Sequence, residues 1–112
     1  MRVLVADDSA VVRLTVARRV RAEGHDVVEA DSVRAALAVD PRALDCALLD
    51  LDLGDGLGTE VAEKLSVPFA FFTSEKSGEA LDRAKALGAV FAKPDQLEDA
   101  IAWLNGRRTR GT

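Results

Sequence analysis

Four groups of polar residues in this sequence each follow a short apolar run, and their side chains are the ones best suited to chemistry. They are Asp7 and Asp8 after Ala6, Asp50 after Leu49, Thr73 and Ser74 after Phe72, and Lys93 after Ala92. Short uninterrupted apolar runs are typical of strands buried on both faces, as in a parallel sheet. The carboxyl ends of parallel strands share one edge, where ligands bind in open α/β folds. The sequence therefore predicts one cleft that contains carboxylates, hydroxyls and an ammonium group.

The carboxylates of this predicted cleft would repel one another. Two like charges about 4 Å apart cost roughly 4 kcal/mol at an effective dielectric constant of about 20, so the cluster should either bind a divalent cation or hold a proton. Oxygen ligands without histidine favour a hard ion such as Mg²⁺. The metal, the Lys93 ammonium and the Thr73 hydroxyl would surround an anion beside Asp50, as phosphoryl transfer requires. Asp50 can then serve as the nucleophile and form an acyl phosphate.

The elements that would position these residues alternate between strand and helix along the whole chain. Strands are expected at 2–6, 27–30, 45–50, 67–72 and 89–92, and helices at 10–23, between Ser32 and Asp40, and at 59–65, 77–87 and 95–104. Short connections and right-handed crossovers predict an α/β fold, a parallel sheet with helices on both faces. The length of 112 residues suits one domain. We assign it to residues 1–106 and expect a polar tail at 107–112.

Composition excludes several classes of function. The net charge of −4 argues against direct nucleic-acid binding, which usually needs a basic face. Cys46 is expected to be an inert packed thiol, and a single cysteine permits no internal disulfide. The chain has no signal-peptide pattern and no apolar run long enough to span a bilayer, so we expect a cytoplasmic protein without membrane contact. His25, which follows Gly24, is expected to face solvent in a turn.

The order of these residues resembles that of a receiver (CheY-like) domain of bacterial two-component response regulators. The matching features are an acid pair after the first strand, Asp50 after the third, Thr73 after the fourth, and Lys93 with Pro94 after the fifth. The resemblance covers essentially the whole chain. It implies a flavodoxin-like, doubly wound sheet of five parallel strands in the order 2-1-3-4-5 with five helices.

The resemblance also implies a role for each acid of the predicted cleft. Asp50 would be the phosphoacceptor. Asp8 would bind Mg²⁺ directly, Asp7 mainly through water, and the backbone carbonyl of Asp52 would complete the protein ligands. The expected cofactor is therefore Mg²⁺.

For the remaining groups and the partners, the resemblance implies a signalling receiver rather than an ordinary enzyme. Thr73 would donate to the phosphoryl oxygens, and Lys93 would pair with the phosphoryl group or with Asp50 before it. Such a domain takes phosphate from a sensor histidine kinase or a phosphotransfer protein and catalyses much of its own phosphorylation and dephosphorylation. A downstream protein or a second copy of the chain would bind through the helix at 77–87, the strand at 89–92 and the helix at 95–104.

The chain departs from the family's pattern in three places. The segment from Asp50 to Thr73 is several residues shorter than usual, which compresses the turn at 53–56. The family's aromatic switch position is Val90, and strand alternation predicts that Phe91 faces the other side of the sheet. Asp52 and Glu75 occupy positions that tune phosphoryl lifetime in the family. Our hypothesis is that both acids crowd the site with negative charge and alter hydrolysis.

Two other functions remain open from the residues alone. The first is a degenerate receiver that acts only as a protein-interaction module. The second, more remote, is a phosphatase of the haloacid dehalogenase type, because Asp50 and Asp52 resemble that family's Asp-x-Asp motif. Against the phosphatase, its metal-binding acid pair follows the lysine, whereas here Asp7 and Asp8 precede Asp50.

Overall fold

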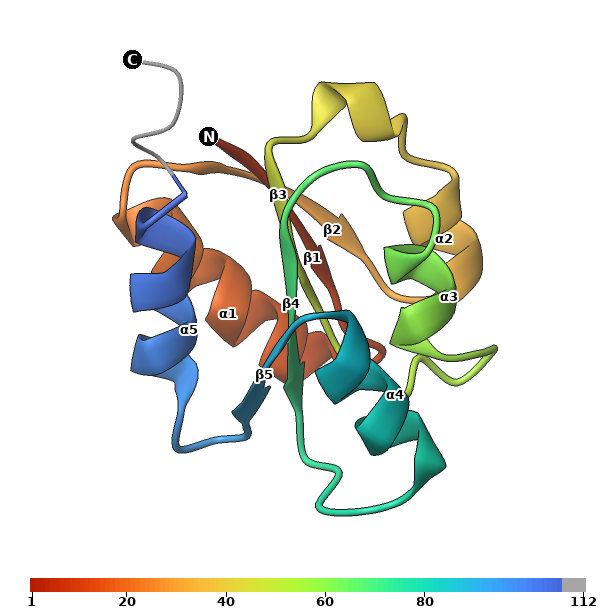
Figure 1. The fold of residues 1–112 in the computed structure, drawn as a ribbon. Helices are drawn as coiled ribbons and strands as arrows, with labels where there is room; N and C mark the ends of the chain where they lie inside the picture. The colour runs from red at the N-terminus through yellow and green to blue at the C-terminus, as the bar shows by residue number, and fades with distance from the viewer. Residues whose placement is uncertain (108–112) are drawn as a thin grey trace.

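The computed structural model of the chain describes residues 1–107, so the part of the predicted tail from residue 108 onward lies outside the described residues. Five parallel strands form one sheet in the order β2-β1-β3-β4-β5 (Figure 1). The strands are β1 (Arg2–Ala6), β2 (Asp26–Ala30), β3 (Cys46–Leu49), β4 (Phe69–Thr73) and β5 (Ala89–Ala92). The fold class and strand order predicted from the sequence are confirmed.

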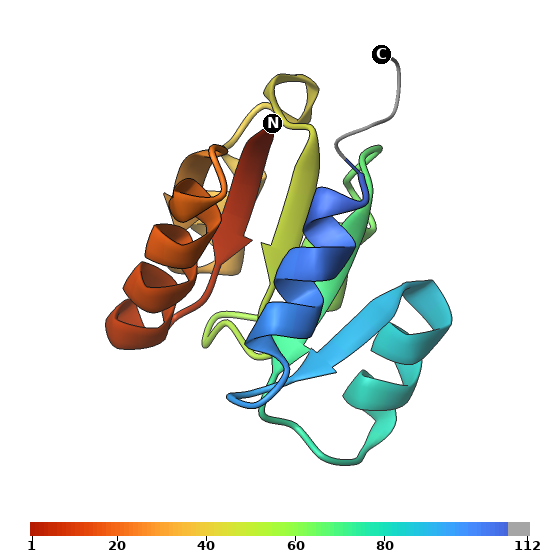
Figure 2. The ribbon, with the colours of Figure 1, turned by 90° about the vertical axis from the view of Figure 1, so that its left-hand side faces the viewer.

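Helices cover both faces of this sheet. They are α1 (Ala10–Ala22), α2 (Val33–Leu37), α3 (Gly58–Ala62), α4 (Glu79–Leu87) and α5 (Leu97–Asn105). Helices α2, α3 and α4 lie on one face, and α1 and α5 lie on the other, which faces the viewer in Figure 2. All four residues of β3 are buried, because this strand is central and covered on both sides.

Successive strand residues enter two separate cores. Leu4, Leu49 and Phe71 pack against α2, α3 and α4. Val3 and Leu48 point the other way and pack with residues of α1 and α5. This alternation fixes the register of each strand, because a slip of one residue would exchange the two faces. The strand ends that carry the polar residues are therefore held at defined levels.

Most differences from the predicted elements lie at their ends. Strand β4 begins at Phe69, after Pro68, whose carbonyl accepts from the Ala47 N–H before the ladder starts. Helix α3 spans Gly58–Ala62, so it begins one residue earlier and ends three residues earlier than the predicted helix at 59–65. Its N-cap is Leu57, whose N–H donates to Glu60 Oε2 at 2.7 Å. A 3₁₀ helix at Pro41–Ala43, labelled η1 below, was not predicted.

The prediction for His25 was also wrong. The residue is only 3% exposed. Its Nε2 lies 3.0 Å from Asn105 Oδ1 at the end of α5, and its Nδ1 lies 3.3 Å from the Met1 amine. The ring joins the first residue of the chain to the last turn of α5 at the amino edge of the sheet. The position of His25 after Gly24 correctly indicated a turn. The side chain is buried because α5 returns to this edge of the sheet.

Gly58 provides a test of how closely α3 must approach the end of β3. Its N–H donates to the Leu51 carbonyl at 2.7 Å, and a Cβ here would overlap the Asp50 carbonyl oxygen and lie 3.1 Å from the Asp50 carbonyl carbon. We expect Gly58→Ala to lower the free energy of unfolding by about 2 kcal/mol or more, because backbone must move to relieve the overlap. Urea denaturation measures this change.

Gly106→Ala is the matched control for that substitution. Gly106 has an ordinary helical φ of −65°, and the nearest atom to an added Cβ is the Trp103 carbonyl oxygen at 3.3 Å. We expect a change within about 0.5 kcal/mol. Equal effects of the two substitutions would contradict the overlap argument.

Candidate functional site

The strand register brings the predicted site residues to one edge of the sheet. Ala6 pairs with Leu49, so Asp7 and Asp50 each follow a strand at the same level. Both continue the ladder, since the Asp50 N–H donates to Ala6 at 2.8 Å and the Asp7 N–H donates to Ala30 at 3.0 Å. The backbones of these two acids are therefore as fixed as the strands themselves.

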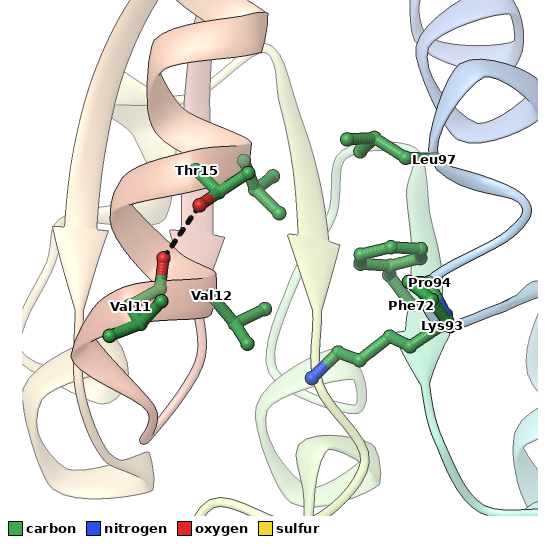
Figure 3. Close-up of a pocket in the computed structure, with 8 residues that line it drawn as sticks. Val11, Val12, Thr15, Phe72, Lys93, Pro94 and Leu97 are labelled. Carbon is green, nitrogen blue, oxygen red and sulfur yellow. Dashed lines mark hydrogen bonds between the residues drawn. The ribbon is translucent and has the colours of Figure 1, made fainter.

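Lys93 reaches the same place from the end of β5. Its N–H donates to the Thr73 carbonyl at 2.9 Å, and its side chain extends across the sheet edge toward β3 (Figure 3). The ammonium lies 2.6 Å from Asp7 Oδ2 and 3.0 Å from Asp50 Oδ2. The side chain of Lys93 is only 13% exposed, that of Asp7 5% and that of Asp50 10%. One lysine thus neutralises part of the charge of two shielded carboxylates.

A third carboxylate, Asp8, completes an acidic cluster. One oxygen from each of Asp7, Asp8 and Asp50 lies within 4.8 Å of the others. Asp8 is exposed, so the cluster opens to solvent on that side. Three carboxylates and one ammonium leave a surplus of two negative charges, and every candidate ligand atom is an oxygen. This donor set fits a hard divalent cation such as Mg²⁺.

Burial and Lys93 shift the pKa of Asp50 in opposite directions. Burial raises the pKa of Asp50 above its ordinary value, and the hydrogen bond from Lys93 only partly offsets this effect. Burial alone would lower the pKa of Lys93, but its hydrogen bonds to Asp7 and Asp50 outweigh burial and raise it. The lysine therefore stays protonated, while the negative charge on Asp50 is destabilised without a further cation.

Thr73 ends β4 next to this cluster and is 2% exposed. Its Oγ1 accepts a hydrogen bond from the Glu75 N–H at 3.2 Å. Since the oxygen is the acceptor in that bond, the hydroxyl hydrogen can still be donated to another group. The structure thus brings Thr73 to the predicted edge, held through its backbone by Lys93 and through its side chain by Glu75.

The turn from β3 to α3 carries Asp52, the remaining predicted ligand. Its side chain accepts from the Gly54 N–H at 3.0 Å, and Asp52 bridges to Leu57. Two backbone bonds close this bridge, Gly58 N–H to Leu51 and Leu53 N–H to Gly56. Among residues 1–107, these two backbone bonds of the turn leave the Asp52 carbonyl oxygen unused. That oxygen is therefore available for the role expected of it.

Sequence reasoning missed Arg13, which supports the acid pair from α1. Its Nη1 donates to the Asp7 carbonyl at 3.0 Å, and its Nε donates to Glu29 Oε1 at 3.2 Å. The arginine thus ties the start of α1 to β2 behind Asp7. The sequence predicts a helix over 10–23, but nothing in it indicated that Arg13 bonds to the Asp7 backbone.

Two of the hollows in the described part of the chain border the site beside Lys93 and Thr73. An apolar cavity of about 150 Å³ lies beside Lys93, with walls from α1, Phe72, Pro94 and Leu97 (Figure 3). A wider groove of about 400 Å³ runs from Thr73 between α4 and β5, past Leu81 and Val90. Val90 packs with the core under α4 and Phe91 with the opposite core, so the predicted alternation is confirmed and Phe91 does not line this groove.

The fold and this cluster together define a class of protein. A five-stranded 2-1-3-4-5 sheet with an aspartate, an acid pair and a lysine at its carboxyl edge is the architecture of a signalling receiver. The sequence matches the response regulator receiver domain family over residues 3–104. The chain belongs to that family, which decides against the haloacid dehalogenase alternative.

Known proteins agree with this membership. The transcriptional regulatory protein PdtaR of Mycobacterium tuberculosis is 29% identical over 108 residues, which cover 89% of this chain and 53% of PdtaR. The chain thus spans about half the length of the curated relatives it matches. Among solved structures, the non-phosphorylated HemR receiver domain from Leptospira biflexa superposes with a TM-score of 0.81 at 28% identity, covering 96% of this chain and 94% of that one.

A CheY-like receiver domain protein from Methanospirillum hungatei JF-1 is similar too, with a TM-score of 0.80 and 26% identity over 98% of both chains. These receivers share the whole described architecture. As a separate observation, none of the helices within residues 1–107 is long and apolar enough to cross a membrane.

The lysine and the two carboxylates allow a test of their coupling. In Mg²⁺-free buffer at neutral pH, we expect Lys93→Met to lower the free energy of unfolding by about 2 kcal/mol, because Asp7 and Asp50 lose their shared ammonium. Asp50→Asn in the Lys93→Met background should restore part of that loss, because one of the two facing charges is removed. Urea denaturation of the unsubstituted protein, Lys93→Met, Asp50→Asn and the double variant measures the coupling.

Arg42→Met is the control, since it breaks the Arg42–Asp40 pair, whose side chains are 89% and 52% exposed. Its effect should stay within about 0.5 kcal/mol. Strict additivity of the Lys93 and Asp50 substitutions would show that the ammonium does not hold the carboxylates together.

Proposed function

We propose that the chain is a phosphoacceptor receiver that takes a phosphoryl group from the phosphohistidine of a sensor kinase or phosphotransfer protein onto Asp50. The observation that carries the proposal is the Lys93 ammonium, 3.0 Å from Asp50 Oδ2 and beside an acidic cluster open to solvent. A buried carboxylate that pairs with a lysine and lies beside other acids can accept a phosphoryl group once a cation neutralises the surplus negative charge. The cytoplasmic location expected from the sequence stays a prediction.

In the transfer step, an Asp50 carboxylate oxygen attacks the phosphorus atom. The bond from phosphorus to the donor histidine nitrogen breaks, and an acyl phosphate forms on Asp50. The donor histidine ring, which carries a proton on its other nitrogen, keeps the electron pair of the broken bond and leaves as a neutral imidazole. The Lys93 ammonium moves no proton in this step. It pairs with a phosphoryl oxygen, while the Thr73 hydroxyl donates to another.

Mg²⁺ would be held by Asp7, Asp8, Asp50 and the Asp52 backbone carbonyl, and when bound it supplies the positive charge that phosphoryl transfer needs. One carboxylate oxygen from each of Asp7, Asp8 and Asp50 lies within 4.8 Å of the others, so the three could bind one ion together. In a separate hydrolysis step, water attacks the phosphorus atom, the bond to the Asp50 oxygen breaks, and inorganic phosphate leaves with the protons of the water, which regenerates the Asp50 carboxylate. Asp52 and Glu75 flank the site, and their charges would influence that hydrolysis.

The phosphodonor would dock on the face formed by α1 and the start of α5. The apolar cavity beside Lys93 opens there, with Val11 at its wall 76% exposed and Leu14 on the same helix 42% exposed (Figure 3). An apolar hollow next to the nucleophile can hold a side chain of a docked helix and so orient its phosphohistidine.

The signal would leave through α4, β5 and α5. Thr73 lies at the inner end of the groove between α4 and β5, and a shift of its hydroxyl toward a phosphoryl group would change the bond from Glu75 at 3.2 Å. Val90, which has no aromatic ring, lines this groove, so the switch would depend on Thr73 and the groove rather than on an aromatic rotamer. A downstream protein or a second copy of the chain is the proposed reader of this face.

Phosphorylation of Asp50 is the first test. Incubation with acetyl phosphate and Mg²⁺ should give a singly phosphorylated protein in intact-mass spectrometry. Asp50→Asn should abolish that species, because an amide oxygen cannot form the acyl phosphate. Chelation of Mg²⁺ should slow the reaction of the unsubstituted protein by at least about 100-fold, as expected for loss of the neutralising charge.

Asp45→Asn is the matched control, since Asp45 precedes the same strand at the opposite edge and accepts from the Arg2 N–H at 2.8 Å. It should be phosphorylated like the unsubstituted protein. No phosphorylated species in the unsubstituted protein would overturn the proposal and favour the interaction-module alternative.

The docking face gives a second test. Val11→Asp should slow transfer from a phosphorylated histidine phosphotransfer domain by about tenfold, because a charge enters the apolar contact. It should leave the rate with acetyl phosphate unchanged, since Val11 does not touch the cluster. Leu37→Asp is the control on α2, where Leu37 is 47% exposed on the opposite face of the sheet. A slower rate with acetyl phosphate as well would mean that Val11→Asp disturbs the site itself.

A further inference from the structure

Asp55, at the tip of the turn between β3 and α3, binds the first turn of another helix. Its Oδ1 accepts from the Val33 N–H at 2.8 Å and its Oδ2 accepts from the Arg34 N–H at 3.0 Å. The third N–H of α2, that of Ala35, donates to Ser32 Oγ at 3.0 Å. Side chains therefore accept from the first three N–H groups of α2, and two of these bonds come from a turn more than 20 residues away.

The turn also packs directly against α2. A Cβ at Gly56 would lie 3.1 Å from Val33 Cγ2, closer than a side chain at that position could ordinarily approach. The two hydrogen bonds to α2 lower the pKa of Asp55 below its ordinary value, so the carboxylate remains an acceptor throughout the neutral range. The positive end of the short helix favours the same ionised form.

This turn is the segment that faces the acidic cluster. It contains Asp52, and a Cβ at Gly54 would lie 3.6 Å from Asp8 Oδ2. Gly54 has a φ of +81°, a conformation that suits glycine. The bond from Gly54 to Asp52 and the bond from Leu53 to Gly56 both lie inside the turn, so they shape it without attaching its tip to the rest of the domain.

We propose that Asp55 is a positioning residue, which anchors the β3–α3 turn to α2 and thereby holds the Asp52 backbone carbonyl in place for a divalent cation at the acidic cluster. The inference rests on the proposed function, because it assigns a task to Asp55 only if the cluster binds the cation. A ligand held in place before binding loses less conformational freedom when the metal arrives. Residues behind metal ligands commonly contribute to affinity in this way.

The experiment compares Asp55→Ala with Asp55→Asn and Asp40→Ala. Asp55→Asn keeps one acceptor oxygen. Asp40→Ala is the matched control, because Asp40 Oδ1 accepts from the Arg42 N–H at 2.9 Å and so caps η1 at the opposite edge of the sheet. Two quantities are measured: amide hydrogen exchange of the Mg²⁺-free protein by NMR, and the Mg²⁺ dissociation constant by calorimetry.

In Asp55→Ala we expect the Val33 and Arg34 amides to exchange faster without Mg²⁺, and the Mg²⁺ dissociation constant to rise by about threefold to tenfold. Asp55→Asn should be intermediate in both measurements. Asp40→Ala should leave the dissociation constant unchanged.

Two results would overturn the inference in different ways. Faster exchange of Val33 and Arg34 in Asp55→Ala with an unchanged dissociation constant would make Asp55 a cap of α2 and nothing more, while the proposed function would stand. Absence of Mg²⁺ binding to the unsubstituted protein would remove the proposed function, and the inference with it.

Discussion

Electrostatic repulsion at the carboxyl edge of the sheet is the constraint on which the rest of this structure depends. Asp7 and Asp50 are held side by side by ladder hydrogen bonds, so they cannot separate to relieve their repulsion. Lys93 offsets part of it at 2.6 and 3.0 Å, and Asp8 adds a further charge. The resulting surplus of negative charge favours a further cation or a bound proton. The oxygen ligands of the cluster suit a hard divalent cation for that task.

The sheet supplies the rigidity that this arrangement needs. Side chains on both faces of β3 are buried, and the two cores fix the register of β1, β3 and β4 against one another. Each functional group follows a strand directly, so its position is set by packing that lies away from the site. Arg13 adds a second attachment by binding the carbonyl of Asp7 and the carboxylate of Glu29. The backbone of each strand-end group is thereby held in place.

The turn after β3 is the part of the site that lies outside the strand ladder. It is short, contains three glycines among its residues 54–58, and ends in a helix of five residues. A short glycine-rich segment has little packing of its own, so its attachment to α2 through Asp55 and the close approach of Gly56 to Val33 gain importance. On the other side of the sheet edge, the groove beside Thr73 is lined by Val90, while Phe91 packs in the opposite core. The turn and the groove thus border the same site.

The sequence alone determined the order of the elements, the strand order through resemblance, and the edge at which Asp7, Asp50, Thr73 and Lys93 meet. It could do so because apolar periodicity and strand ends are local properties, and because parallel strands align their carboxyl ends. Tertiary structure decided the rest. His25 is buried because α5 returns to the amino edge, Arg13 meets the Asp7 carbonyl because α1 packs beside β2, and Asp55 caps α2 because the shortened turn lies against it. Each of these contacts joins residues whose separation depends on how helices pack, and no local pattern in the chain encodes that distance.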